Sequence, residues 1–501
     1  MDVATGTVRW STRSFARGAT ALALLLCACA AALAQGQPPP AGPARAPDEW
    51  LPSGVKNDLG GLIRQRTIHV AVPYSRTLYF NDNGRERGLT ADSVRDFERW
   101  INRRYKDALD NRPITVVIRP TTRDKLLTEV AKGRADIAAG NLTITDQRRK
   151  LVDFAVAHGQ KPANEVVLTG PKSVPIPDAN ALAGKTVHVR PSSSYHSSLT
   201  QLNERFRKEG QPAMKLVLVP DALEDEDMME MLNAGLLQTI VVDDWKARMW
   251  TRVLPRIIVN EGAVVRSRGQ VGWAVRKGSP KLKAALDEYH DTVLRKRGVY
   301  NQWMNSYNAK IQKLKDSTGS AERKRFEDTL ALFEKYGSRY GFDPLMLAAQ
   351  GYQESQLEQD AKSPVGAIGI MQLMPATAAE LNVGDIRIAE VNVHAGTKYM
   401  DQLMTRYLDD AKFDRTNRTL FAFAAYNCGP GNIRKMRAEA EKRGLDKNRW
   451  FNNVELVTAE KIGMETTTYV RNIYKYYVAY TLMEDIAEVQ RKAREGVQRG
   501  K

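Results

Sequence analysis

Residues 343–375 read DPLMLAAQGYQESQLEQDAKSPVGAIGIMQLMP and join an apolar segment to a hydrophobic loop that contains two glycines. Asp343 and Pro344 form a typical helix start, because Asp accepts hydrogen bonds at the N-cap and Pro fits the first helical position. The residues that follow are apolar around the whole helix, which indicates a buried helix. We therefore expect a buried helix over residues 343–356.

Glu354 stands near the end of this helix and shares a face with Leu347 and Gly351. Burial disfavours a charged carboxylate, so the site is expected to raise the pKa of Glu354. A carboxyl group with a raised pKa is a competent general acid at neutral pH. From these residues alone, the opposite interpretation stays open, in which the glutamate ends a helix and points to water.

Most glycosidases place two carboxylic acids at the bond that they cleave. The nearest acids downstream of Glu354 are Glu358 and Asp360, which lie in a polar stretch and are interpreted as surface charges. The sequence is therefore compatible with one carboxylate that acts alone.

The N-terminal half alternates strand and helix patterns. Runs rich in β-branched residues predict strands at 67–72, 113–120 and 135–140, with helical patterns between them. A similar alternation fills residues 185–244, and residues 271–303 give one more strand and a helix that could return to the first unit. This order predicts two α/β lobes with largely parallel sheets.

The C-terminal part has a different pattern, because strand-like alternation fades after residue 325. Helical patterns occupy residues 325–340, 343–356, 375–382, 390–408, 417–427 and 466–484. The predicted fold class is thus an α/β two-lobed module followed by a mainly α domain.

The first 34 residues combine three arginines with an apolar stretch and a small-residue motif, which is typical of a secretory signal peptide. Two interpretations of its end stay open: cleavage after Ala34, or lipidation at Cys29 after removal of the preceding residues. Residues 35–61 begin with a Pro-, Ala- and Gly-rich run and are interpreted as a disordered tether.

The formal net charge of the chain is +17, which favours polyanionic partners. The basic residues are scattered and no aromatic–basic motif is present, so cell-wall polymer or a membrane surface is expected rather than nucleic acid. The six histidines are dispersed and no phosphate-binding glycine motif occurs, so we expect neither a metal nor another cofactor.

Four ordered motifs carry a family resemblance. Glu354-Ser355, SPVGAIGIMQLMP at 363–375, AYNCGPGN at 425–432 and ETTTYV at 465–470 resemble the signature stretches of lytic transglycosylases with the goose-type lysozyme fold. Upstream, residues 133–154 resemble type II periplasmic solute-binding proteins. The combination is similar to the membrane-bound lytic murein transglycosylase F family over roughly residues 62–484.

Together with composition, the resemblance implies a domain order. It is a signal peptide (1–34), a tether (35–61), a solute-binding module (62–305), a linker (306–324), a catalytic domain (325–484) and a basic tail (485–501). Within the module, lobe 1 would comprise about 62–158 and 271–305, and lobe 2 about 160–268.

The resemblance implies that Glu354 is the single catalytic acid/base, which cleaves the bond between N-acetylmuramic acid and N-acetylglucosamine in peptidoglycan and leaves 1,6-anhydro ends. It assigns substrate binding to Ser363, Gln372, Met374, Tyr426, Asn427, Glu465 and Tyr469. Glu465 is equally compatible with a role in capping the helix that begins near Thr466. In the module, the implied ligand-binding residues are Asn141, Thr143, Arg148 and Asp243, with Arg148 binding a ligand carboxylate and Asp243 an ammonium group.

The implied partners are peptidoglycan and a small amino-acid or muropeptide-like ligand that biases the catalytic domain. The implied location is the periplasm, with attachment to the inner face of the outer membrane as one possibility. Two alternatives stay open: a goose-type lysozyme that hydrolyses the glycan, and a glycan-binding sensor without turnover. Endo or exo cleavage and the oligomeric state are also open.

Overall fold

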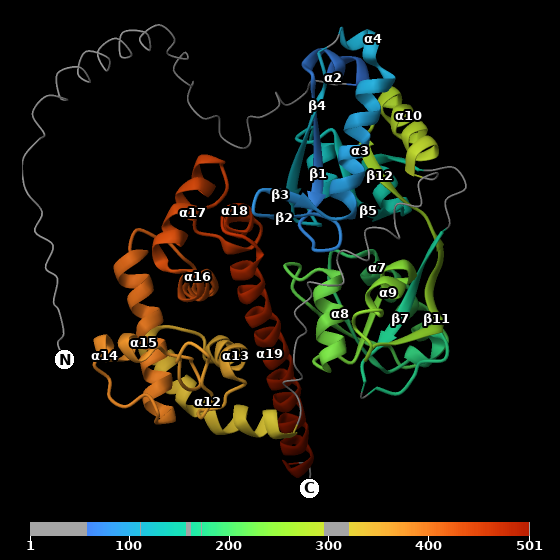
Figure 1. Ribbon diagram of the computed structural model, residues 1–501. Coiled ribbons are helices and arrows are strands. Elements are labelled where there is room, and N and C mark those ends of the chain that lie inside the picture. The colour runs from blue at the N-terminus through green and yellow to red at the C-terminus, as the bar shows by residue number, and fades with distance from the viewer. Residues whose placement is uncertain (1–57, 111, 157–161, 172, 295–319, 500–501) are drawn as a thin grey trace, which may run out of the picture. The chain divides into compact units, whose positions relative to one another are not determined.

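The computed structural model describes residues 58–110, 112–156, 162–171, 173–294 and 320–499. These residues form two α/β lobes followed by a helical domain (Figure 1). The fold class predicted from the sequence is therefore confirmed. The predicted signal peptide, most of the tether and most of the linker lie outside the described residues.

The first lobe is built on a five-stranded sheet with the order β4-β1-β5-β12-β6. Its strands are β1 (Thr67–Pro73), β4 (Thr115–Thr121), β5 (Ile137–Thr143), β6 (Val152–Ala155) and β12 (Val271–Arg276). β1 runs parallel to β4 and β5, whereas β12 is antiparallel to β5 and β6. The chain thus returns to the first lobe through β12, as residues 271–303 suggested.

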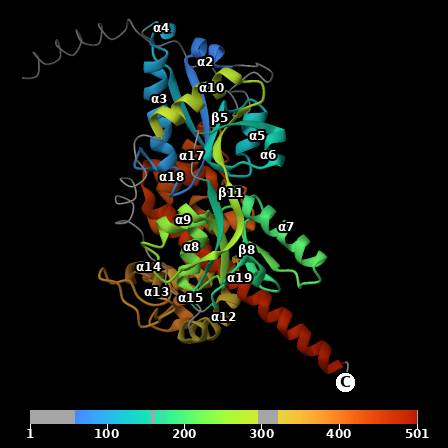
Figure 2. The same cartoon turned by 90° about the vertical axis from the view of Figure 1, so that its right-hand side faces the viewer.

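Helices cover this sheet, and two of them lie side by side (Figure 2). They are α3 (Leu89–Arg104) and α10 (Pro280–Tyr289), whose Phe97 and Tyr289 rings have centroids 5.3 Å apart. The smaller elements are α2 (Leu59–Gln65), β2 (Phe80–Asp82), β3 (Arg85–Arg87), α4 (Lys106–Leu109), α5 (Leu126–Ala131), α6 (Asp146–Leu151) and η3 (His290–Leu294).

The second lobe has a sheet with the order β11-β7-β10-β8-β9. Its elements are β7 (Ala163–Thr169), η2 (Ala179–Leu182), β8 (Thr186–Val189), α7 (Ser194–Lys208), β9 (Lys215–Leu218), α8 (Asp225–Ala234), β10 (Thr239–Asp243), α9 (Asp244–Trp250) and β11 (Ile258–Gly269). β8 is parallel to β9 and β10, whereas β7 is antiparallel to β10 and β11.

β7 and β11 were not predicted from the sequence. The register between them shifts at three places between Asn260 and Gly269, and such irregularities break the alternation of apolar and polar residues that reveals a strand.

The helical domain contains α12 (Ser320–Tyr340), α13 (Pro344–Ser355), α14 (Pro375–Leu381), α15 (Ala389–Tyr407), α16 (Arg415–Cys428), α17 (Pro430–Lys442), η5 (Trp450–Val454), α18 (Glu455–Lys461) and α19 (Met464–Arg499). Among the helices of the described residues, none is both long and apolar enough to cross a membrane.

Two helices of this domain were not predicted, namely α17 and α18. Only Ile433, Arg437 and Ala440 of α17 are buried, so its apolar stripe is too narrow to stand out in the sequence. α18 has only seven residues and follows an irregular segment with a left-handed residue at Asn452.

Three predicted boundaries need correction. α2 starts at Leu59 inside the predicted tether, because Asp58 caps it and Leu59 and Leu62 are buried. α12 starts at Ser320 inside the predicted linker, and α19 continues to Arg499, past the predicted helix end at residue 484. A helix that is stabilised by tertiary packing can continue into a polar segment, so polar composition alone did not identify these helix ends.

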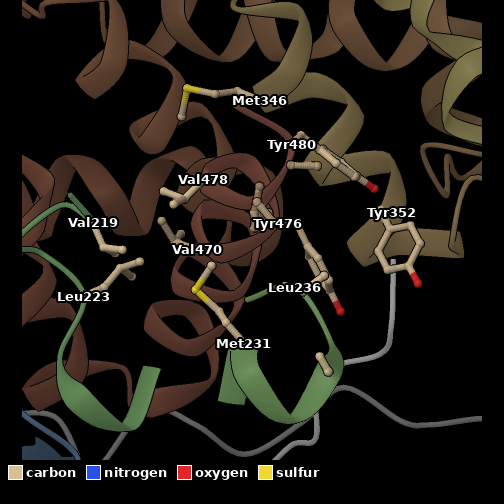
Figure 3. Packing of buried hydrophobic residues seen from close by; sticks show 14 of the residues in the cluster. Val219, Leu223, Met231, Leu236, Met346, Tyr352, Val470, Tyr476, Val478 and Tyr480 are labelled. Atoms are coloured by element: carbon tan, nitrogen blue, oxygen red, sulfur yellow. The ribbon is translucent and has the colours of Figure 1, made fainter. Parts of the chain in front are cut away.

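α13 lies in the core of the helical domain, where it packs against α12 and α19. Gly351 brings these neighbours close: a Cβ atom at this position would lie 3.0 Å from Ile370 and 3.1 Å from Phe333. The side chains of Met346, Tyr352, Tyr476 and Tyr480 belong to the same buried cluster (Figure 3).

That cluster continues into the second lobe. Met231 of α8 and Leu236, just after α8, belong to it together with Val470 and Tyr476 of α19 (Figure 3). Buried charges lie on the same two helices: Lys475 Nζ is 2.6 Å from Glu230 and 3.0 Å from Asp227. α8 and α19 are thus joined by both apolar packing and ion pairs.

Arg471 of α19 and Arg76 of the first lobe complete this group of charges. Arg471 binds Glu455 of α18 at 2.6 Å and Asp227 at 3.3 Å, and Arg76 binds Asp227 at 3.0 Å. Burial disfavours the charge of Asp227, but Lys475, Arg76 and Arg471 outweigh that effect and lower its pKa.

We predict that Lys475→Ala destabilises the protein by about 3–5 kcal/mol, because it removes the fully buried cation that pairs with both Asp227 and Glu230 and leaves their charges only partly compensated by Arg76 and Arg471. Lys461→Ala is the matched control, since Lys461 forms an exposed pair with Glu460 and should change stability by less than about 1 kcal/mol. The measurement is the urea midpoint of unfolding followed by circular dichroism. Equal midpoints for both variants would show that the α8–α19 pairs contribute little.

Candidate active site

Glu354 lies in the last turn of α13 and is only partly exposed. The hydroxyl of Tyr469, from α19, donates a hydrogen bond of 2.5 Å to Oε1 of Glu354. Desolvation raises the pKa of Glu354 to about 7, against the opposing effect of this hydrogen bond. The group can therefore exist as acid or carboxylate near neutral pH.

The loop at 363–375 is held beside Glu354 by two side chains. Ser355 donates from Oγ to the carbonyl of Ile370 at 2.9 Å, which explains the serine after the glutamate. Asn392, fully buried on α15, accepts from the amide of Met371 at 2.8 Å and donates to the carbonyl of Ile368 at 2.9 Å. These bonds fix the backbone of the loop.

Gly369 is required at its place in this loop. Its φ is +82°, and a Cβ atom there would lie 2.2 Å from Nδ2 of Asn392. Any larger residue would displace the amide that holds the loop.

Tyr426 of α16 lines the same site. Its hydroxyl donates to the carbonyl of Met371 at 2.7 Å, and its ring packs edge-on against Tyr399 with centroids 5.3 Å apart. Desolvation, with the nearby Glu354 as a further cause, raises the pKa of Tyr426 well above its usual value. The structure therefore brings Tyr426 and Tyr469 together at Glu354, from two different helices.

The remaining predicted residues of the loop have different environments. Ser363 accepts from the amide of Ala367 and closes a turn. Gln372 donates to the carbonyls of Ala361 and Gly369, so its NH₂ group is used inside the loop. Met374 is 41% exposed and offers an apolar surface.

Asn427 and Glu465 lie where α16 and α19 meet. Oδ1 of Asn427 accepts a hydrogen bond of 2.7 Å from the hydroxyl of Thr466. Glu465 is exposed in the first turn of α19, where a carboxylate is favoured by the helix dipole. Cys428, next to Asn427, is a free and partly buried thiol.

The other acids near Glu354 in sequence are surface groups. Glu358 is exposed and lies 3.3 Å from Arg325, and Asp360 is also exposed. Within the described part of the chain, no three His, Cys, Asp or Glu side chains are grouped so that they could hold a metal ion. The site therefore offers one carboxyl group and two tyrosines for chemistry.

In the module, Arg148 and Thr143 lie together at the contact between the lobes. Arg148 donates to the carbonyl of Thr143 at 2.8 Å, and Thr143 Oγ1 is 3.2 Å from the hydroxyl of Ser194 in the second lobe. Desolvation, together with the positive charges of Arg123 and Arg266, lowers the pKa of Arg148 to about 10.

Asp243 and Asn141 complete the predicted ligand residues. Asp243 ends β10, and its backbone amide donates to the hydroxyl of Tyr195, the residue after Ser194. Desolvation raises the pKa of Asp243 in spite of Lys246 nearby. Nδ2 of Asn141 is buried without a hydrogen-bond partner, on a residue with a φ of +56°.

Two groups of residues at these sites were not predicted from the sequence. Gln350 is fully buried one turn before Glu354, and its Nε2 donates to the hydroxyl of Tyr469 at 3.3 Å. As an amide inside the apolar run of this helix it was visible in the sequence. The second group is the acidic start of α8, where Glu224 binds Arg123 of the first lobe at 2.8 Å.

We predict that Glu354→Gln stabilises the protein at pH 8 by about 1–3 kcal/mol and has almost no effect near pH 4. The folded-state pKa of about 7 lies above the ordinary value of 4.5, so the native protein loses stability as pH rises through this window. Glutamine does not titrate and avoids that loss. Urea unfolding of both proteins at the two pH values checks this; an equal difference at both would contradict it.

Comparisons with known proteins find matches to both parts of the chain. The family model of the transglycosylase SLT domain matches residues 331–449, and that of the bacterial extracellular solute-binding proteins, family 3, matches residues 67–310. A solved ancestral arginine-binding protein bound to arginine is 20% identical, with a TM-score of 0.37, over 48% of this chain and 97% of its own.

Two full-length relatives are both named membrane-bound lytic murein transglycosylase F. The protein of Desulfosudis oleivorans is 29% identical over 71% of this chain and 79% of its own length. That of Alteromonas mediterranea is 25% identical over 87% of this chain and 94% of its own length. With both domain models matched in this order, the chain is similar over most of its length to members of the membrane-bound lytic murein transglycosylase F family.

Proposed function

We propose that this lytic transglycosylase cleaves the β-1,4 bond between N-acetylmuramic acid and N-acetylglucosamine of peptidoglycan and leaves 1,6-anhydro-N-acetylmuramic acid ends. The observation that carries the proposal is the single carboxyl group of Glu354, whose pKa of about 7 keeps part of it protonated at neutral pH. The exposed Glu358 and Asp360 do not supply a second acid to the site.

In the first step, protonated Glu354 donates its proton to the glycosidic oxygen as the bond to C1 of the muramic residue breaks. The acetamido group of that residue stabilises the positive charge at C1. In the second step, the carboxylate of Glu354 accepts the proton of the C6 hydroxyl, and O6 forms the new bond to C1. No water is consumed, and Glu354 ends in its starting protonation state.

Tyr469 stabilises the carboxylate formed in the first step, because it donates a hydrogen bond to Oε1 of Glu354. Met374 supplies an adaptable apolar surface for sugar rings, and Oε1 of Gln372 accepts hydrogen bonds from them. Ser363, Tyr426, Asn427 and Glu465 complete the proposed substrate-binding set.

The products provide the test. Purified protein without its first 34 residues is incubated with peptidoglycan sacculi, and the released sugars are identified by mass spectrometry. We expect anhydro products, and a rate about 10²- to 10⁴-fold lower for Glu354→Gln.

Reducing-end products lost in Glu354→Gln would instead identify a goose-type lysozyme that uses water. Binding of sacculi without any released sugar, in both proteins, would identify a glycan-binding sensor.

The module is proposed to bind a small amino-acid or muropeptide-like ligand between its lobes. Arg148 would bind the ligand carboxylate, which is supported by the desolvation of its guanidinium group and by the nearby positive charges of Arg123 and Arg266, which together lower its pKa. Asn141 and Thr143 would add hydrogen bonds, and Asp243 would bind the ammonium group. The buried, unpartnered Nδ2 of Asn141 supports a missing acceptor at this site.

Ligand binding is proposed to modulate catalysis through α8 and α19. The first turn of α8 binds the first lobe through Glu224 and Arg123, and also through Glu226 and the hydroxyls of Ser75 and Thr77. The same helix holds Lys475 of α19, which also carries Tyr469. A ligand-induced movement of the lobes would therefore act through α8 and α19 on the hydrogen bond between Tyr469 and Glu354.

Calorimetry with a panel of L-amino acids and with the muropeptides released from sacculi tests this second proposal. We expect at least one of these probes to bind, and Arg148→Met to weaken that binding by at least about tenfold. The control is Arg149→Met, because Arg149 is the exposed neighbour. A bound probe that leaves the transglycosylase rate unchanged would refute the modulation.

The location is proposed to be the periplasm. A lipid on Cys29 would attach the protein to the inner face of the outer membrane, whereas cleavage after Ala34 would release it. The name of the relatives, membrane-bound, supports attachment.

A further inference from the structure

Gln350 is a polar side chain in the most apolar helix of the catalytic domain. It is 0% exposed and precedes Glu354 by four residues, so the two side chains leave α13 on the same face. Burial of an amide costs free energy unless its hydrogen bonds are made. The buried amide of Gln350 therefore needs a hydrogen-bond partner.

That partner is the hydroxyl of Tyr469. Nε2 of Gln350 donates to Tyr469 Oη at 3.3 Å, and Tyr469 Oη donates to Glu354 Oε1 at 2.5 Å. The tyrosine hydroxyl has one hydrogen, which it uses in the hydrogen bond to Glu354. Its oxygen is therefore available to accept a hydrogen bond from Gln350. The three groups form a chain of hydrogen bonds that ends on Glu354.

We propose that Gln350 is a positioning residue for the transglycosylase reaction, whose amide holds and polarises the Tyr469 hydroxyl toward Glu354. A donor on the phenol oxygen makes the hydroxyl a stronger donor, because hydrogen bonds in a chain polarise one another. The bond from Tyr469 to Glu354 then strengthens most when Glu354 becomes a carboxylate, as it does when the glycosidic oxygen is protonated. The inference rests on the proposed acid/base role of Glu354.

The second atom of the amide supports this assignment. Oε1 of Gln350 is buried and has no hydrogen-bond partner in the structure. If the amide group of Gln350 rotates by about 180°, its Oε1 faces Tyr469 and accepts a hydrogen bond from the tyrosine hydroxyl. The Tyr469 oxygen can then accept a hydrogen bond from the protonated carboxyl group of Glu354. The amide of Gln350 can therefore hydrogen-bond to Tyr469 whether Glu354 is protonated or ionised, which an apolar side chain cannot do.

Among the residues that the structure describes, two titratable side chains face Glu354. They are Tyr469 from α19 and Tyr426 from α16, and Tyr426 is in turn packed against Tyr399 of α15. The hydrogen bond of Tyr426 goes to the carbonyl of Met371 and not to Glu354. Gln350 therefore acts on the acid through Tyr469.

The test measures the pKa of Glu354 directly. Protein labelled with ¹³C at the glutamate carboxyl carbon is titrated by NMR, and the Glu354 signal is assigned by its absence in Glu354→Gln. We expect Tyr469→Phe to raise this pKa, because the carboxylate loses a donor, and Gln350→Met to raise it by a smaller amount. The double variant should match Tyr469→Phe alone, since Gln350 acts through the tyrosine.

Activity gives the second readout. We expect Gln350→Met to lower kcat/KM by about fivefold, as for the loss of one hydrogen bond, and to move the alkaline limb of the pH profile upward. The matched control is Gln402→Met on α15, which should leave both unchanged. Gln350→Leu provides a second apolar replacement, and circular dichroism verifies folding.

An unchanged Glu354 pKa in folded Gln350→Met and Gln350→Leu would overturn the inference, as would effects that add to those of Tyr469→Phe. Reducing-end products from the native protein would refute the anhydro reaction but not the role of Gln350, because the NMR titration does not depend on the product.

Discussion

The hydrogen bond between Tyr469 and Glu354 joins the helix that carries the acid to the last helix of the domain, and the site depends on it. Burial alone would leave Glu354 neutral over a wider pH range, whereas the hydroxyl of Tyr469 stabilises the charged form. The balance puts the pKa near 7. Close packing at Gly351 and the loop pinned by Asn392 maintain the desolvation on which this balance rests.

α19 has a second role besides supplying Tyr469. Arg471 and Lys475, two and six residues farther along, form buried ion pairs with α18 and α8. Buried pairs of this kind add little net stability over apolar packing, but they tolerate few alternative arrangements. Their geometry therefore adds a constraint on how α8 docks on α19, beside the apolar packing of residues such as Met231 and Val470.

Elements with regular patterns were predictable, and elements with interrupted patterns were not. β1 is a run rich in β-branched residues, and α13 begins with Asp343 and Pro344 before an unbroken apolar segment; the structure places both where they were expected. β11 is long, but its register shifts interrupt the alternation, and α17 buries only a narrow stripe. In the site, Glu354 and Tyr469 were identified through motifs, whereas Gln350 lies inside an apolar run and matched no motif.

The sequence by itself determined the fold class, the order of the domains and the identity of Glu354 as the candidate acid, because local patterns and short motifs encode these features. Only the tertiary structure decided the pKa of that acid and its hydrogen-bond partner, which is 115 residues away in the chain. Likewise, it alone showed that Lys475 meets Glu230 across 245 residues. Desolvation and ion pairing sum over neighbours in space, and neighbours in space are not specified by any single stretch of sequence.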